Sequence, residues 1–176
     1  MAASAGCACM EPSQRIDEAS PETARELLRS CCGSTRWVEG MMALRPFGTT
    51  DGMLSAARRE WFALTTADWI EAFSHHPKIG DRESLRARFP ATHQLSEREQ
   101  AGMRAASDQA IDALAQGNAA YERRFGYIFI VCATGKSAGE MLDLLTARLQ
   151  NDPATEIGVA AAQQAEITDL RLKLLG

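Results

Sequence analysis

Residues 137–153 read SAGEMLDLLTARLQNDP, and this stretch indicates a helical protein. Ser137 followed three positions later by Glu140 is the capping-box pattern, in which each side chain bonds the other residue's backbone amide at a helix start. Apolar residues then recur at helical spacing over residues 141–149, as on the buried side of an amphipathic helix. Pro153 follows an Asn-Asp pair that ends this helix and caps the next one, because proline suits the first turn of a helix.

The same start and stop signals recur along the chain and predict helices almost throughout. Ser20 precedes Pro21 as an N-cap, and Ser96 with Glu99 forms another capping box. His76 precedes a proline, and a residue in that position disfavours helical geometry, so the helix before it ends there. The predicted helices cover residues 21–33, 37–44, 52–62, 66–74, 96–114, 118–125, 138–149 and 153–174.

One segment departs from this pattern. Residues 126–134 are mostly apolar, β-branched or aromatic, and they lie between Gly126 and Gly135. A single strand would have no partner elsewhere in the chain, so we expect a buried irregular or extended segment. Its backbone N–H and C=O groups must find partners. These partners lie within the protein or, if the segment borders a cavity, on a polar ligand.

Length and composition are typical of one globular domain. The chain has 176 residues, of which 45% are hydrophobic and 24% charged, and domains cluster near roughly 100–150 residues. We predict an all-α fold: a single compact domain of about eight helices over residues 19–176, after a flexible extension over residues 1–18. No window reaches the ~18 apolar residues of a membrane span. A formal net charge of −4 argues against a nucleic-acid binder, which would carry a basic stripe.

The cysteines favour a reducing compartment. Five are present, at positions 7, 9, 31, 32 and 132, and an odd count with two near-adjacent pairs makes a poor disulfide framework. Cys132 lies in the most apolar stretch and is interpreted as a small buried side chain. Residues 1–18 lack the basic and apolar regions of a signal peptide, so we expect a cytoplasmic protein.

Three side chains could carry acid–base or anion-binding chemistry. His76 follows a predicted helix whose C-terminus favours a protonated imidazole, so it suits a proton donor; the alternative is a histidine that caps the helix. Glu99 either completes its capping box or lies where free helix N–H groups receive a ligand oxygen. Arg171 projects within about 40° of Ile167, so it either extends to solvent or meets an anion. Arg148 has the same two alternatives but lies nearer its helix end, where a surface role beside the helix dipole is easily taken.

The sequence contains no motif for cofactor or metal chemistry. It has no glycine-rich phosphate loop, no Gly-x-Ser-x-Gly elbow and no His-Glu-x-x-His pair. Its three histidines are not joined by a cluster of cysteines or aspartates, as a metal site would require. We therefore expect no cofactor and no metal, and catalysis, if present, by side chains alone.

Several short motifs occur in a fixed order along the chain. They are HHPKIG at 75–80, SxxEQxG at 96–102, FGYIFIVCA at 125–133, RLxND at 148–152 and LRL at 170–172, with WV at 37–38 and RPF at 45–47. Each motif is weak alone, but together they resemble the OHCU decarboxylases of uric acid breakdown. The resemblance extends over residues 20–175, nearly the whole predicted domain.

The resemblance implies an all-helical, cofactor-free homodimer without nucleic-acid or membrane partners. Such an enzyme converts 2-oxo-4-hydroxy-4-carboxy-5-ureidoimidazoline (OHCU) to (S)-allantoin and carbon dioxide in purine catabolism, whereas uncatalysed decay gives racemic allantoin. The matched motifs imply catalytic roles for His76 as proton donor, Glu99 and Arg171. The substrate-binding residues implied in the same way are Pro77, Ser96, Glu97, Arg98, Glu99, Gln100, Phe129, Ile130, Val131, Cys132 and Ala133.

Two other functions stay open on the sequence. The first is a non-catalytic helical adaptor that binds a purine-derived metabolite or a protein partner through a cleft near His76. The second is a hydrolase of the preceding intermediate, 5-hydroxyisourate. Separate assays with freshly generated OHCU and with 5-hydroxyisourate distinguish these functions from the decarboxylase.

Overall fold

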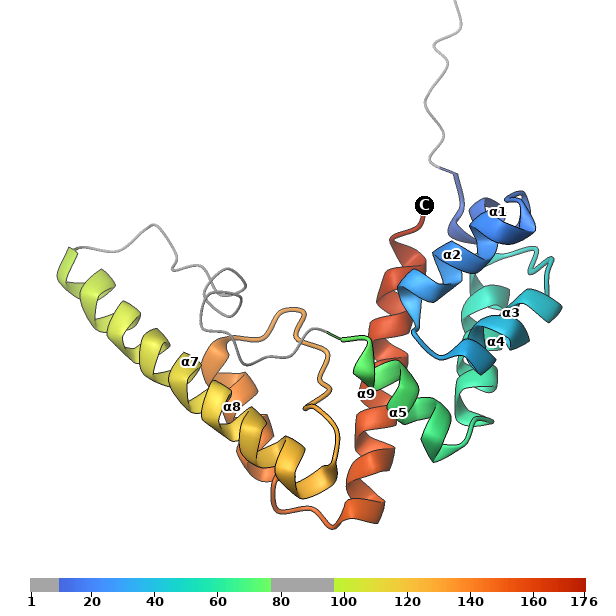
Figure 1. Cartoon of the computed structure of the whole chain (residues 1–176). Coiled ribbons are helices and arrows are strands. Elements are labelled where there is room, and N and C mark those ends of the chain that lie inside the picture. Colours follow the sequence, from blue (N-terminus) through green and yellow to red (C-terminus); the bar gives the residue numbers. More distant parts are fainter. Residues whose placement is uncertain (1–9, 77–96) are drawn as a thin grey trace, which may run out of the picture. The chain divides into compact units, whose positions relative to one another are not determined.

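The computed structural model describes residues 10–76 and 97–176, with the backbone alone over 97–107 (Figure 1). Within these ranges every regular element is a helix and no strand is present, which confirms the predicted all-α fold. The eight helices are α1 (Pro12–Asp17), α2 (Pro21–Cys31), α3 (Thr35–Ala43), α4 (Thr50–Phe62), α5 (Thr66–Ser74), α7 (Glu97–Phe125), α8 (Ala138–Arg148) and α9 (Pro153–Lys173).

By its internal contacts the chain divides into two compact units. One comprises residues 1–72 and 165–176, and the other comprises residues 73–164. Helix α9 contributes its first part to the second unit and its last part to the first. The predicted boundary at residue 18 stays a prediction, although residues 12–17, which were assigned to the flexible extension, form α1.

Local capping signals set several helix ends. The Ser137 hydroxyl accepts the Glu140 N–H at 3.3 Å, and the Glu140 carboxylate accepts the Ser137 N–H at 2.8 Å, so the predicted capping box is present. Helices α3 and α4 begin two residues before their predicted starts. The reason is that Ser34 and Thr49 cap them by accepting backbone N–H groups.

Helix α7 is one continuous element, although the sequence analysis predicted two. The residues around Gly117 were expected to separate them, yet they remain helical. Gly117 instead allows α8 to approach α7, because a Cβ atom added there would meet the Leu145 Cδ2 atom at 2.5 Å. The predicted N-cap of this helix, Ser96, lies outside the described residues.

Helix α1 is held by contacts that are distant in sequence. Its Ile16 side chain is fully buried. The Arg45 Nη2 atom donates to the carbonyl oxygens of Ile16, Asp17 and Ala19 at 2.6–3.0 Å, close to the point where the helix ends. The Asp17 carboxylate in turn accepts the N–H of Phe47 at 2.9 Å. The loop after α3 therefore completes the short N-terminal helix.

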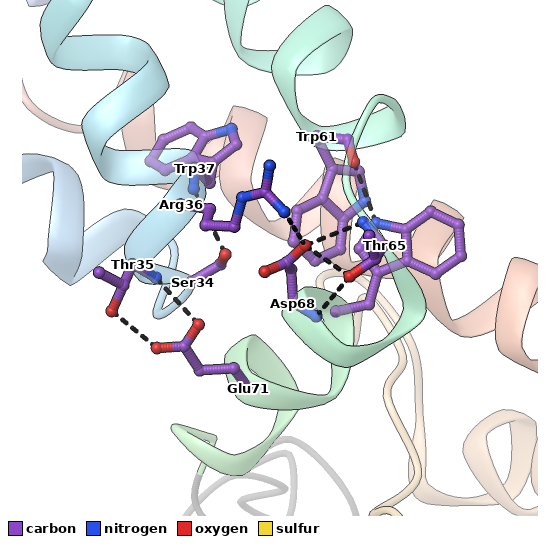
Figure 2. Close-up of polar contacts among 9 residues, drawn as sticks. Ser34, Thr35, Arg36, Trp37, Trp61, Thr65, Asp68 and Glu71 are labelled. Carbon is purple, nitrogen blue, oxygen red and sulfur yellow. Dashed lines mark hydrogen bonds and ion pairs between the residues drawn. The ribbon is translucent and has the colours of Figure 1, made fainter.

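Helices α3 and α5 are joined by polar contacts at the start of α3 (Figure 2). The Glu71 carboxylate accepts the N–H and the hydroxyl of Thr35 at 3.2 and 2.7 Å. At the start of α5, Asp68 accepts both the N–H and the hydroxyl of Thr65, and Arg36 lies 3.6 Å away. The hydrogen bonds from Thr65 lower the pKa of the Asp68 carboxyl group.

The irregular segment and Cys132 lie as predicted, whereas Cys7 and Cys9 fall outside the described residues. Residues 128–133 form neither helix nor strand, and Phe129 and Ile130 are each 2% exposed. Cys31, Cys32 and Cys132 are buried free thiols, and burial raises the pKa of Cys32 to about 12. None of the described helices combines the length and the apolar character needed to cross a bilayer.

Candidate active site

His76 is the first candidate residue that the structure describes. It lies two residues beyond the end of α5, and its N–H donates to the Phe73 carbonyl oxygen at 3.1 Å. Its imidazole Nε2 atom lies 2.5 Å from the Oε1 atom of Gln164, a fully buried residue of α9. The ring is therefore held by a neutral amide. No local pattern in the sequence indicates a role for Gln164.

The segment over residues 129–133 is fixed through its backbone. The Cys132 N–H donates to the Gln163 side-chain oxygen at 2.9 Å, and its carbonyl oxygen accepts from the Lys136 ammonium at 2.8 Å. The Ile130 carbonyl oxygen accepts from Arg148 Nη1 at 2.7 Å. Partners within the protein thus bind the Cys132 N–H and one lone pair on each of these two carbonyl oxygens.

Arg148 is buried, and its predicted surface role is wrong. Its side chain is 9% exposed and pairs with the fully buried Glu156, whose Oε1 lies 2.7 Å from Nε and 2.6 Å from Nη2. The guanidinium carbon lies 4.6 Å from the centre of the Phe129 ring. A charge at a helix end can stay in water, but here Glu156 of the following helix and a carbonyl of the irregular segment replace that water.

Two further side chains complete this buried network. Tyr121 donates its hydroxyl hydrogen to Glu156, and Asn151 donates to the second carboxylate oxygen at 2.6 Å. Burial, with the hydrogen bond to Glu156, raises the pKa of the Tyr121 hydroxyl, so it remains a proton-bearing donor at neutral pH. The network connects α7, α8, α9 and the irregular segment within the unit 73–164.

Arg171 belongs to the other unit and has different surroundings. Its Nη1 atom donates to the Cys31 carbonyl oxygen at 3.1 Å and lies 3.5 Å from the Ser30 carbonyl oxygen, at the end of α2. Helix C-terminal carbonyl groups carry partial negative charge, so they attract the cation. The predicted partner of Arg171 was an anion or solvent, whereas the structure places the guanidinium at a helix end.

The structure describes the other predicted site residues only in part. It places His76, Phe129, Ile130, Val131, Cys132 and Ala133 in the same unit, and the adjacent residues Gln163 and Gln164 contact two of them. Pro77 and Ser96 lie outside the described residues. Only the backbone of α7 is described at Glu97, Arg98, Glu99 and Gln100.

The chain matches a known protein family over the region that contains the motifs. Residues 17–173 match the family described as OHCU decarboxylase. The chain belongs to the OHCU decarboxylase family. It is 33% identical over 129 residues to 2-oxo-4-hydroxy-4-carboxy-5-ureidoimidazoline decarboxylase of Amia calva, with 73% of each chain covered. It is also 34% identical over 155 residues to the uric acid degradation bifunctional protein TTL of Arabidopsis thaliana.

The fold leads to the same family. A crystal structure of OHCU decarboxylase in the presence of (S)-allantoin is similar, with 35% identity and a TM-score of 0.70, covering 89% of this chain and 98% of that one. The present chain spans about half the length of the Arabidopsis relative, 48%, and 31% of the bifunctional protein PucL of Bacillus subtilis.

Proposed function

We propose that this protein decarboxylates OHCU to (S)-allantoin and carbon dioxide. The observation that carries the proposal is the family match over residues 17–173, which includes every motif of the predicted site. The similar crystal structure of OHCU decarboxylase in the presence of (S)-allantoin supports the same substrate class. The position of His76 beside α9 supports a role for its imidazole, because the ring contacts Gln164 and the backbone N–H of the residue bonds the Phe73 carbonyl oxygen.

The proposed reaction needs one proton at a defined place. When the carboxylate leaves as carbon dioxide, its bonding electron pair is delocalised from the hydroxyl-bearing carbon through the neighbouring ureido-bearing carbon onto the imidazoline nitrogen. His76 then donates a proton to the ureido-bearing carbon from one side while the hydroxyl group gives up its proton and becomes a carbonyl, so a single enantiomer forms. Delivery from a fixed position accounts for stereochemical control as well as for rate.

Arg171 and Glu99 are proposed to complete the chemistry. Among the described residues, the Arg171 guanidinium hydrogen-bonds through Nη1 alone, which leaves Nε and Nη2 to hold the carboxylate or ureido group of the substrate. Glu99 would orient the imidazole or the substrate hydroxyl and favour the protonated imidazole. Backbone groups at residues 96–100 and 129–133, with Pro77, would bind the carbonyl and ureido groups.

We also propose that the enzyme works without a cofactor, as a homodimer, in the cytoplasm. The electron pair released by decarboxylation can be held by the substrate ring itself, so the chemistry requires no external electron sink. Dialysis against a chelator should leave turnover unchanged. Sedimentation equilibrium should give twice the mass of one chain.

The test uses His76→Asn with His75→Asn as its matched control. His75 is the exposed neighbour and lacks the following proline, so its replacement should leave turnover unchanged. The His76 variant should stay folded and lose about 10²–10⁴-fold in kcat. Allantoin formed from freshly generated OHCU is followed by optical rotation and chiral chromatography. Wild-type turnover and S-selectivity in the His76 variant would contradict its assignment.

The same assay distinguishes the decarboxylase from a non-catalytic helical adaptor. If the unmodified protein leaves the decay of OHCU and the racemic product unchanged, the protein is a binding module and the decarboxylase proposal is wrong. Loss of 5-hydroxyisourate, measured separately, would instead indicate the hydrolase.

A further inference from the structure

Two adjacent glutamines on α9 hold two parts of the proposed site. Gln164 contacts the His76 imidazole at 2.5 Å, and Gln163 accepts the Cys132 N–H at 2.9 Å. Gln164 is fully buried, and burying an amide is costly unless its polar atoms are bonded. All four residues belong to the unit 73–164. A single turn of α9 therefore contacts both the proposed proton donor and the backbone of the proposed substrate-binding segment.

The chemistry of the Gln164 contact favours one protonation pattern. An imidazolium ion carries hydrogen on both nitrogens and can only donate, whereas an amide oxygen can only accept. Oε1 is the atom that faces His76 Nε2. The contact therefore suits a ring that keeps its Nε2 hydrogen both before and after it acts as an acid.

The Gln164 amide is uncharged, and this affects how readily the His76 imidazolium gives up its proton. A carboxylate in this position would favour the protonated imidazole and so make it a weaker acid. An amide oxygen orients the ring without adding a negative charge. Gln164 can thus hold His76 in place while leaving its proton available for transfer.

We propose that Gln164 is a positioning residue that orients His76 and keeps its hydrogen on Nε2. This inference rests on the proposed function. The bond between the hydroxyl-bearing ring carbon and the carboxyl group breaks, carbon dioxide leaves, and the electron pair forms a double bond to the adjacent ureido-bearing carbon as the C=N pair moves onto the ring nitrogen. The ureido-bearing carbon takes the proton from Nδ1 of the His76 imidazolium, and the imidazole becomes the neutral Nε2–H tautomer bonded to Gln164. The hydroxyl group becomes the carbonyl of allantoin as its proton passes to the ring nitrogen. Restoring the Nδ1 proton of His76 from solvent completes the cycle.

The kinetic test replaces Gln164 with two side chains of similar size. Gln164→Leu removes the acceptor and should lower kcat by about 100-fold, the effect of a small misplacement of a catalytic group. KM should change little, and the excess of (S)-allantoin should fall. Gln164→Glu restores an acceptor oxygen and should recover part of the lost kcat, with the pH–rate profile moved to higher pH. Gln116→Leu, on the exposed face of α7, is the matched control and should behave as wild type.

A second measurement needs no substrate. The chain has three histidines, so the 15N signals of the His76 ring can be assigned by comparison with His76→Asn. The neutral ring should be the Nε2–H tautomer in the wild type and lose that preference in Gln164→Leu. An Nδ1–H tautomer in the wild type, or an unchanged kcat in Gln164→Leu, overturns the inference.

The two measurements separate this inference from the proposed function. If the wild type forms no excess of (S)-allantoin, the proposed function is wrong, while the ring tautomer still decides whether Gln164 holds His76. If Gln164→Leu does not fold, the wild-type tautomer and the pH profile of Gln164→Glu decide instead. An unchanged pH profile in Gln164→Glu would then contradict the contact.

Discussion

Replacing Glu156 by alanine tests the buried network around the irregular segment. The Arg148 side chain is 9% exposed and the Glu156 side chain is fully buried, so the pair is shielded from water. Removing the carboxylate leaves the guanidinium without a counter-charge and takes an acceptor from Tyr121 and Asn151. Breaking a buried pair in this way costs about 3–5 kcal/mol of unfolding free energy.

That loss converts to a measurable change in thermal stability. For a chain of this length, Tm falls by about 2–4 °C per kcal/mol, so Glu156→Ala should lower Tm by about 6–20 °C. Calorimetry of the purified protein measures the change in Tm, and urea denaturation measures the change in unfolding free energy. Glu39→Ala is the control, because it removes the exposed Arg25–Glu39 pair, with side chains 41% and 52% exposed, and should leave Tm almost unchanged.

The double variant Arg148→Met/Glu156→Leu distinguishes two causes of the lost stability. One is the cost of an unpaired buried charge, and the other is the loss of attraction between the two charges. Without either charge, no ion remains unpaired in the interior, so the double variant should be more stable than Glu156→Ala. Two results would refute the reasoning. One is a Tm change in Glu156→Ala no larger than that of the exposed control, and the other is a double variant less stable than Glu156→Ala.

Four further outcomes follow from single sites. Gly117→Ala should reduce the unfolding free energy by about 1–3 kcal/mol, because its Cβ would overlap a buried leucine; Gly158→Ala, which meets nothing within 4 Å, should increase it by up to about 1 kcal/mol in urea titrations. The lowered pKa of Asp68 means that its contribution to stability is present above its unfolded pKa, near about 3.9, and is lost as pH falls through the folded value. Asp68→Asn should therefore be less stable than wild type at pH 6 and lose that disadvantage in acid, as measured by thermal unfolding; an equal difference at both pH values would contradict it. Cys32, with its pKa raised to about 12, should resist a thiol-specific reagent at pH 8 until the protein unfolds, and rapid labelling of the native protein would contradict its burial.

Local signals in the sequence determined much of the fold. The capping box at Ser137 and the proline after His76 act within four residues of a helix end, so they predict that end without knowledge of the rest of the chain. Helix α5 has its predicted bounds, Thr66–Ser74. The motif order likewise led to the family, because motifs and their spacing are properties of the chain itself.

Helix α1 shows where such local signals fail. Residues 12–17 carry one local start signal, Pro12 at the first turn, but no acidic residue in that turn and no side-chain cap. The helix instead depends on Arg45, which donates to carbonyl groups near the helix end, and on burial of Ile16. These groups come close only after the chain has folded, so the sequence analysis assigned the stretch to a flexible extension.

The same distinction applies to the candidate site. Local patterns were enough to predict that His76 follows a helix end and that an apolar irregular segment lies farther along the chain. The contact of Gln164 with the imidazole and the burial of Arg148 against Glu156 became visible in the folded chain alone. The cause is that a single glutamine or arginine forms no sequence pattern from which its partners can be predicted. Its role depends on which distant polar groups folding brings within hydrogen-bond distance and removes from water.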